Sequence, residues 1–182
     1  FAACNGDSTC EAACDSQQTT DLAASDVIGN ILFADAAAAA VIGAREVSRG
    51  PDILGAGTSL WPDTTDALGM RLSDTGLRLM LSPQLPELVA LHLPKALDAF
   101  LSAHGLARSD IEFWVIHPGG PRVLEAIGAT LQLSERALAP PWEVWSAFGN
   151  VPSATVFFIL EALSRTNPVP AGRLGVMMAF GP

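Results

Sequence analysis

Two polar side chains in this sequence occupy positions typical of catalytic groups, each at a tight turn behind an apolar segment. His117 follows the apolar run 113–116 and precedes Pro-Gly-Gly. Asn150 follows Gly149 and precedes Val-Pro-Ser-Ala. Catalytic groups are concentrated on loops that a rigid scaffold positions. We therefore interpret residues 113–154 as the stretch around which the rest of the chain is organised.

The imidazole and the amide together have the chemistry of an oxyanion hole. The glycines after His117 let the backbone approach a ligand closely, and a helix beginning just beyond Asn150 would add a partial positive charge. Loss of one donor to a developing oxyanion typically costs about 3 to 4 kcal/mol in the transition state. Each residue also has a structural interpretation, with Asn150 as a helix N-cap. His92 and His104 are assigned to helix surfaces or packing.

The elements that must position these residues follow an α/β pattern with a mixed sheet. Residues 1–24 lack periodicity and are expected to be irregular. Order is expected from Val27, first as an apolar segment 27–33, then as a buried strand through the small residues 36–44, with a further extended segment at 53–60.

Alternation and turn residues then predict a hairpin from strands 70–73 and 77–81. Helical spacing, caps and buried apolar runs predict the remaining elements. These are a helix over 86–104 ended by Gly105, a buried strand at 113–116, helices over 121–131, 142–148 and 154–164, and a last strand at 174–179. Pro140 and Pro141 are expected before the first turn of the helix 142–148, and Ser153 is expected to cap the helix 154–164.

Composition excludes several classes of function. The formal net charge of -9, with one lysine, Lys95, and scattered arginines, argues against a nucleic-acid surface. No apolar run reaches the roughly 18 residues that a membrane helix needs, and no signal peptide is evident, so a cytoplasmic location is expected. Three cysteines, Cys4, Cys10 and Cys14, lie within the first fourteen residues, and their spacing predicts neither a zinc site nor disulfides.

Four motifs resemble the C-terminal half of the type III polyketide synthases, the chalcone and stilbene synthase family. They are, in the family's order, Gly-Asn-Ile-Leu-Phe-Ala-Asp at 29–35, Phe-Trp-Val-Ile-His-Pro-Gly-Gly-Pro at 113–121, Gly-Asn-Val-Pro-Ser-Ala at 149–154 and Ala-Phe-Gly-Pro at 179–182. The resemblance implies a thiolase-like layered α-β-α fold over 25–182, after an irregular 1–24. It also implies a homodimer that condenses malonyl-CoA with an acyl-CoA starter, with these CoA thioesters as substrates and no bound cofactor or metal.

In that family a cysteine, a histidine and an asparagine form a triad, and the resemblance assigns the last two roles to His117 and Asn150. It assigns substrate contacts to Phe33, Leu79, Phe180, Gly181 and Pro182. Leu79 stands where the family has its second entrance phenylalanine, and this change implies a wider cavity or another starter.

The nucleophilic cysteine is expected upstream of Phe1, because the cysteine-rich start does not match its surroundings in the family. The chain, which does not begin with Met and stops after Pro182, is therefore expected to be a fragment that is inactive alone. Two alternatives stay open. One is a condensing enzyme like ketoacyl synthase III that uses acyl carrier protein, and the other is a non-catalytic half-domain that only pairs with another subunit.

Overall fold

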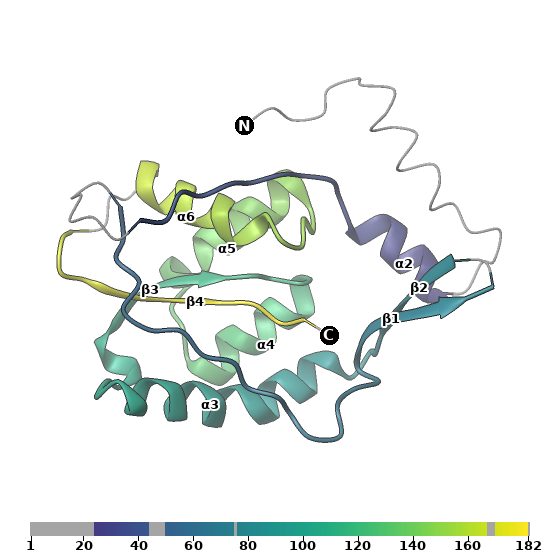
Figure 1. Ribbon diagram of the computed structural model, residues 1–182, viewed down its shortest axis with the longest axis horizontal. Coiled ribbons are helices and arrows are strands. Elements are labelled where there is room, and N and C mark those ends of the chain that lie inside the picture. The colour runs from purple at the N-terminus through teal and green to yellow at the C-terminus, as the bar shows by residue number, and fades with distance from the viewer. Residues whose placement is uncertain (1–23, 44–49, 75, 167–169, 182) are drawn as a thin grey trace.

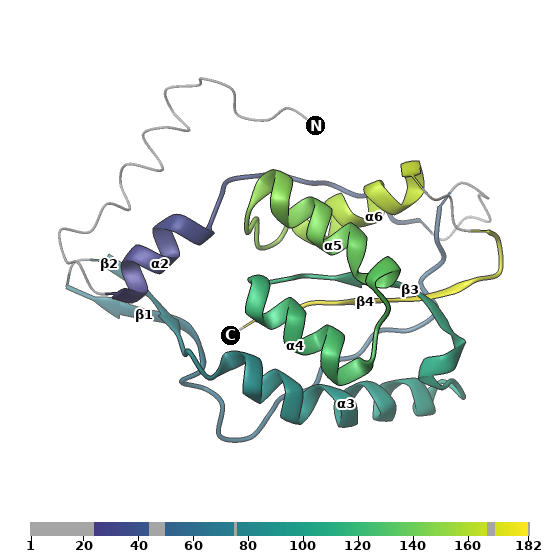
Figure 2. The ribbon, with the colours of Figure 1, turned by 180° about the vertical axis from the view of Figure 1, so that it is seen from behind.

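The computed structural model describes residues 24–43, 50–74, 76–166 and 170–181. At its centre lie two parallel strands, β3 (Ile111–Ile116) and β4 (Leu174–Met178). Helices α3 (Leu85–Ala103) and α4 (Pro121–Leu131) cover one side of this pair, and α5 (Glu135–Phe148) and α6 (Thr155–Thr166) cover the other (Figure 1). The reverse view shows the same layers (Figure 2).

The β3 side chains divide between two apolar clusters, as strand geometry requires when both faces are buried. Trp114 and Ile116 join the larger cluster with α3, α4 and Val176 of β4. Val115 points to the opposite face and joins a smaller cluster with α5 and α6, including Ile159. The buried strand expected at 113–116 is confirmed, and so is the final strand.

A second unit of structure lies at one end of this layered core (Figure 1). The hairpin of β1 (Leu68–Ser73) and β2 (Gly76–Leu81) is antiparallel, as its alternation predicts. Helix α2 (Ala24–Leu32) packs against β2. A Leu79 methyl carbon lies only 3.4 Å from the point where a Cβ on Gly29 would stand. Within the described residues, the antiparallel and the parallel pairs form separate two-stranded sheets.

Two stretches expected to be extended strands have no regular structure. The small-residue strand predicted for 36–44 is wrong over its described part, because residues 34–43 are irregular and Val41 is fully exposed at 101%. Residues 50–60 are likewise irregular and exposed. A strand forms only where a neighbour accepts its backbone hydrogen bonds. The apolar segment that begins at Val27 is helical through Leu32 and irregular beyond it.

The predicted helices are found with changed boundaries. The helix expected at 86–104 is α3, and it ends in hydrogen bonds of the Schellman type, from Leu106 N–H to the Leu101 carbonyl and from Gly105 N–H to the Ser102 carbonyl. The helix at 121–131 is confirmed as α4. A one-turn 3-10 helix, η1 (Arg108–Asp110), leads directly into β3.

Helix α5 begins seven residues earlier than expected, so the placement of its prolines was wrong. The Ser134 hydroxyl accepts from the Ala137 N–H and caps the helix at that point. Pro140 and Pro141 therefore lie inside the helix instead of before its first turn. At the start of α6 the recorded side-chain hydrogen bond is made by Thr155, whose hydroxyl donates to the Val151 carbonyl over 2.5 Å, and not by Ser153.

Candidate functional site

His117 lies directly beyond the carboxyl end of β3. Its N–H donates to the Met178 carbonyl over 2.9 Å, which extends the pairing of β3 with β4 by one residue. His117 is buried, with 6% of its surface exposed, and its Nδ1 finds no hydrogen-bond partner in the described part of the chain. Burial lowers the pKa of His117 from its ordinary value, since desolvation disfavours the imidazolium form. The ring is therefore held neutral in this chain near neutral pH.

Asn150 is brought to the same end of the strands by a different turn. Its N–H donates to the Leu32 carbonyl over 2.9 Å, and its own carbonyl accepts from the Ala34 N–H over 2.8 Å. This short parallel bridge places Phe33 beside Asn150. The preceding residue, Gly149, has φ 70° and ψ -155°, a conformation that is essentially restricted to glycine. The glycine at this turn is thus required by the backbone path.

One hydrogen bond joins the two turns. The Asn150 Nδ2 donates to the carbonyl of Gly119 over 3.3 Å, across a separation of 31 residues. Gly119 itself has φ 62°, which lets the chain turn back immediately after His117. The sequence placed both polar residues on turns; the tertiary structure brings these turns into contact.

The joined turns keep unused hydrogen-bonding capacity. Among the described residues, His117 Nδ1 and Asn150 Oδ1 are buried without partners. A buried polar atom left unsatisfied costs about 1 to 3 kcal/mol. The amide also retains a second N–H, because only one is directed at Gly119. His117 and Asn150 together can therefore bind a polar oxygen atom and an ionisable group of a ligand or of another residue. They lie at the carboxyl ends of the strands, where open α/β sheets bind ligands.

Of the other predicted site residues, Phe33 and Phe180 adjoin the segments that carry Asn150 and His117, and Leu79 lies on the hairpin. Phe33 is exposed and adjoins Asn150 through the bridge. Phe180 is half-buried just beyond β4, two residues after the Met178 that accepts from His117. Leu79 lies on the hairpin, packed toward Gly29 of α2. Gly181 is exposed, and Pro182 falls outside the described residues.

The two remaining histidines are not part of this site. His92 stacks on Trp61, with ring centroids 5.2 Å apart, and the exposed His104 has its Nδ1 2.9 Å from the Phe100 carbonyl, so the helix-surface or packing roles expected for both are confirmed. The three cysteines fall outside the described residues. Within the described ranges, no group of three His, Cys, Asp or Glu side chains is arranged to hold a metal ion.

Sequence reasoning missed Trp61, which contacts both α3 and the end of β4. Its ring centroid lies 5.8 Å from that of Phe180. Nothing in the sequence marks this tryptophan, because it follows an irregular segment without periodicity. Sequence reasoning also missed the backbone carbonyls of Met178 and Gly119, which accept hydrogen bonds from His117 and Asn150. No pattern of side chains can reveal such acceptors.

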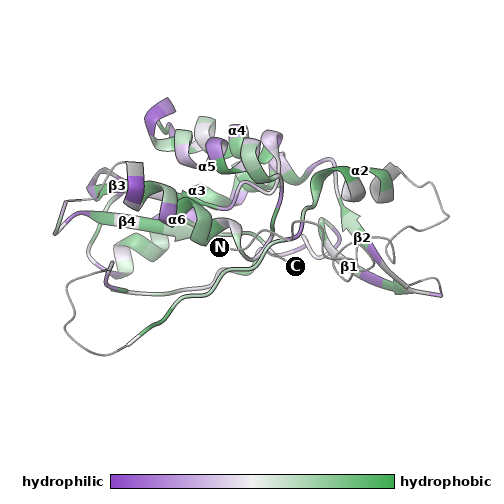
Figure 3. Cartoon of the chain, turned by 90° about the horizontal axis from the view of Figure 1, so that it is seen from above, coloured by the Kyte–Doolittle hydropathy of each residue, from purple (hydrophilic) through white to green (hydrophobic). Residues whose placement is uncertain are grey.

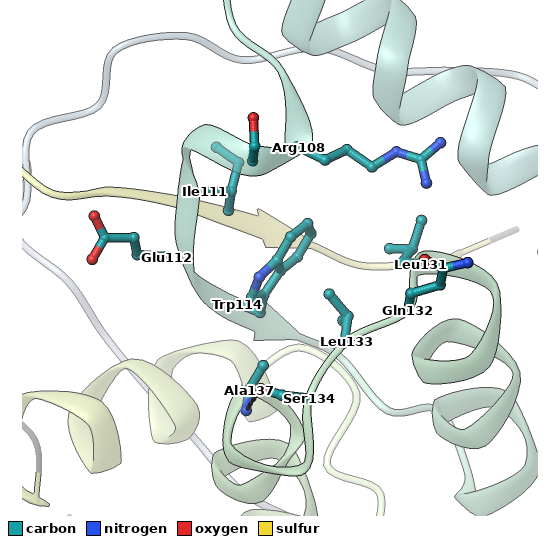
Figure 4. A pocket seen from close by; sticks show the side chains of 10 residues that line it. Arg108, Ile111, Glu112, Trp114, Leu131, Gln132, Leu133, Ser134 and Ala137 are labelled. Atoms are coloured by element: carbon teal, nitrogen blue, oxygen red, sulfur yellow. Dashed lines mark hydrogen bonds between the residues drawn. The ribbon is translucent and has the colours of Figure 1, made fainter.

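A shallow pocket of about 400 Å³ lies at the opposite end of β3 (Figure 4). Trp114, Arg108 and Ser134 are among its lining residues, and none of the predicted site residues is. The Arg108 guanidinium is already paired with Asp98, at 2.6 Å from each carboxylate oxygen. This pocket is therefore separate from the His117 and Asn150 site.

The parallel strand pair between helix layers, with a polar site at its carboxyl end, defines an α/β protein of the thiolase-like class. This fold is shared with a solved structure, the 1,3,6,8-tetrahydroxynaphthalene synthase of Streptomyces coelicolor A3(2), a bacterial type III polyketide synthase. The TM-score is 0.73 at 28% sequence identity, over 90% of this chain and 46% of that one.

Residues 52–182 match the family described as chalcone and stilbene synthases, C-terminal domain, and the chain belongs to that family. The 1,3,6,8-tetrahydroxynaphthalene synthase of Streptomyces peucetius subsp. caesius is 38% identical over 86% of this chain and 43% of its own length. The 3,5-dihydroxyphenylacetyl-CoA synthase of Streptomyces toyocaensis is 33% identical over 95% of this chain and 46% of its own length. The chain thus spans less than half the length of these relatives.

No helix in the described part of the chain is long and apolar enough to cross a membrane.

Proposed function

We propose that this chain is the C-terminal catalytic half of a type III polyketide synthase, an acyltransferase that condenses malonyl-CoA with an acyl-CoA starter. The observation that carries the proposal is the hydrogen bond from Asn150 Nδ2 to the Gly119 carbonyl. It joins the turn of Asn150 to the turn of His117 in a buried site, in a chain that belongs to the chalcone and stilbene synthase family.

In the proposed reaction, the starter acyl group is held as a thioester on a cysteine that lies upstream of Phe1. Malonyl-CoA then loses CO2: the bond from the carboxylate to the methylene carbon breaks, and its electron pair forms the enolate of acetyl-CoA. N–H donors of His117 and Asn150 stabilise the enolate oxygen. The enolate carbon attacks the starter thioester, and the cysteine leaves as a thiolate. His117 beside that thiolate would lower the pKa of the thiol.

The remaining assignments follow from the same proposal. Phe33, Leu79 and the Phe180-Gly181-Pro182 segment line the substrate cavity, and the bridge from Phe33 to Asn150 supports this for the first of them. Two CoA thioesters are the substrates, no bound cofactor takes part, and the working form is a homodimer. Because the proposed nucleophile is not in this chain, the chain alone does not turn over.

The test uses the full-length parent protein and follows 14CO2 released from labelled malonyl-CoA. His117→Gln and Asn150→Ala each remove one donor, and each should lower the decarboxylation rate about 100-fold or more. His104→Gln, at the exposed end of α3, is the matched control and should keep the rate.

Three outcomes would contradict parts of this proposal. If both site variants match the starting protein, the oxyanion hole is wrongly assigned. Turnover only with malonyl groups carried on acyl carrier protein would identify the protein as a condensing enzyme like ketoacyl synthase III. A full-length protein with no decarboxylation at all would be a non-catalytic member of the family.

A further inference from the structure

Trp61 lies between helix α3 and the segment that follows β4. Its indole stacks on His92 of α3, with centroids 5.2 Å apart and planes inclined by 20°. On another side it meets Phe180 at 5.8 Å and 50°. The ring packs against the larger apolar cluster. The indole is therefore anchored to the rigid α3 layer and supports the aromatic ring that follows β4.

Phe180 in turn is coupled to His117 through the backbone. The Met178 carbonyl, two residues before Phe180, accepts the His117 N–H over 2.9 Å. Only one residue, Ala179, separates Phe180 from the residue that makes this hydrogen bond, so the backbone at Phe180 is held close to that of His117. The Trp61 ring contacts the Phe180 ring and supports it from one side.

A second connection runs from Trp61 to the hairpin. The Thr64 hydroxyl donates to the Trp61 carbonyl over 2.9 Å, the Ala67 N–H donates to the Thr64 carbonyl over 2.9 Å, and the Ser82 N–H donates to the Ala67 carbonyl over 2.8 Å. These bonds join residues 61–67 to both ends of the hairpin. The hairpin carries Leu79, which packs toward α2, and α2 leads into the bridge with Asn150.

We propose that Trp61 is a specificity-determining positioning residue: it fixes Phe180 and the Leu79 hairpin relative to α3, and thereby sets the size of the substrate cavity that the proposed function requires beside His117 and Asn150. This inference rests on the proposed function. A large planar ring is suited to this role, because it buries much apolar area with little rotamer freedom. Its buried Nε1 has no partner among the described residues, so packing, not hydrogen bonding, holds the ring.

The test compares Trp61→Ala, Trp61→Phe and Trp142→Ala in the full-length parent protein. Trp142 is the matched control, a half-buried tryptophan that packs against the same apolar cluster from α5. Products made from malonyl-CoA are measured by mass spectrometry. Trp61→Ala should shift the main product to a chain longer by at least one two-carbon unit, while decarboxylation stays within about twofold of the starting rate. Trp61→Phe should restore the original product, and Trp142→Ala should keep it.

Amide hydrogen exchange tests the positioning without relying on activity. Trp61→Ala should increase exchange about tenfold or more in residues 68–81 and 176–181, and Trp142→Ala should not. A parent protein that does not decarboxylate malonyl-CoA would refute the proposed function, and exchange would then decide the positioning role alone. Unchanged products in an active Trp61→Ala protein would overturn the specificity role. Unchanged exchange in both segments would overturn the positioning role.

Discussion

At the scale of single residues, the environment of His117 determines its charge. The ring is buried, its Nδ1 has no partner among the described residues, and burial lowers its pKa. A cysteine thiolate beside the ring would act in the opposite direction, because a nearby opposite charge favours the imidazolium form. The isolated chain and the full-length protein should therefore differ in the protonation of this one group.

The lowered pKa of His117 predicts how the stability of the isolated chain depends on pH. Below about pH 6.5 the unfolded chain binds a proton at this histidine more fully than the folded chain does, so the free energy of unfolding falls as the pH decreases. The loss is at most about 1.4 kcal/mol per pH unit and ends below the folded pKa.

Urea unfolding at pH 7.5 and 5.5 measures this effect. His117→Gln lacks the titrating group and should show the smaller difference between the two pH values, and His104→Gln serves as the control. An equal pH dependence in His117→Gln and the starting chain would show that burial does not perturb the ring. In the full-length protein, NMR titration should give a higher pKa for His117 than in this chain.

At the scale of elements, the site depends on the turn between α5 and α6. Gly149 N–H donates to the Trp145 carbonyl and ends α5, and Asn150 immediately joins the bridge to residues 32–34. The Leu32 carbonyl lies 3.5 Å from the point where a Cβ on Gly149 would stand. A Cβ would therefore make only an ordinary contact there, and it is the backbone conformation that restricts the position to glycine.

Gly149→Ala should lower the free energy of unfolding of the chain by about 1 to 3 kcal/mol, because alanine is strained in this backbone region. Chemical denaturation measures the change. Gly43→Ala is the control, since its added methyl group meets nothing within 4 Å and its backbone is not in the left-handed region. A loss no greater than that of Gly43→Ala would mean that the turn relaxes at no cost. In the parent protein, Gly149→Ala should also slow decarboxylation by displacing Asn150.

At the scale of the whole molecule, apolar side chains are unevenly distributed. The layered core buries its apolar residues, whereas hydrophobic residues of the irregular segments 34–43 and 50–60 are exposed. Figure 3 shows how hydrophobic and hydrophilic residues are distributed along the backbone. Ile53, for example, is 70% exposed. Because the chain spans less than half the length of its relatives, we expect these segments to be covered in the full-length protein.

This expectation can be tested with one substitution in two proteins. Ile53→Ala should change the free energy of unfolding of the isolated chain by less than about 0.5 kcal/mol, as surface substitutions do. In the full-length parent it should cost about 2 to 5 kcal/mol, as burial of the side chain would require. Leu93→Ala is the control, because Leu93 is only 5% exposed in α3 and should be costly in both. A small effect of Ile53→Ala in both proteins would show that the segment stays exposed.

The sequence alone was sufficient for elements whose signals are local. Alternation around the turn at Asp74 predicted the hairpin, helical spacing predicted α3 and α4, and the run before His117 predicted β3. The predicted start of α5 was wrong, because it was placed after Pro140 and Pro141. The helix instead begins after its N-cap Ser134 and contains both prolines. The motifs were also sufficient to recognise the family to which the chain belongs.

Only the tertiary structure decided which turns meet. His117 and Asn150 each signalled a loop tip, but the hydrogen bond of Asn150 to Gly119 and its bridge to Phe33 depend on how separate elements pack. The same is true of the segments 36–43 and 53–60, whose strand-like composition forms no strand without a neighbour for its backbone groups. Local patterns determine helices, hairpins and turns. Contacts between distant residues depend on partners that no local pattern specifies.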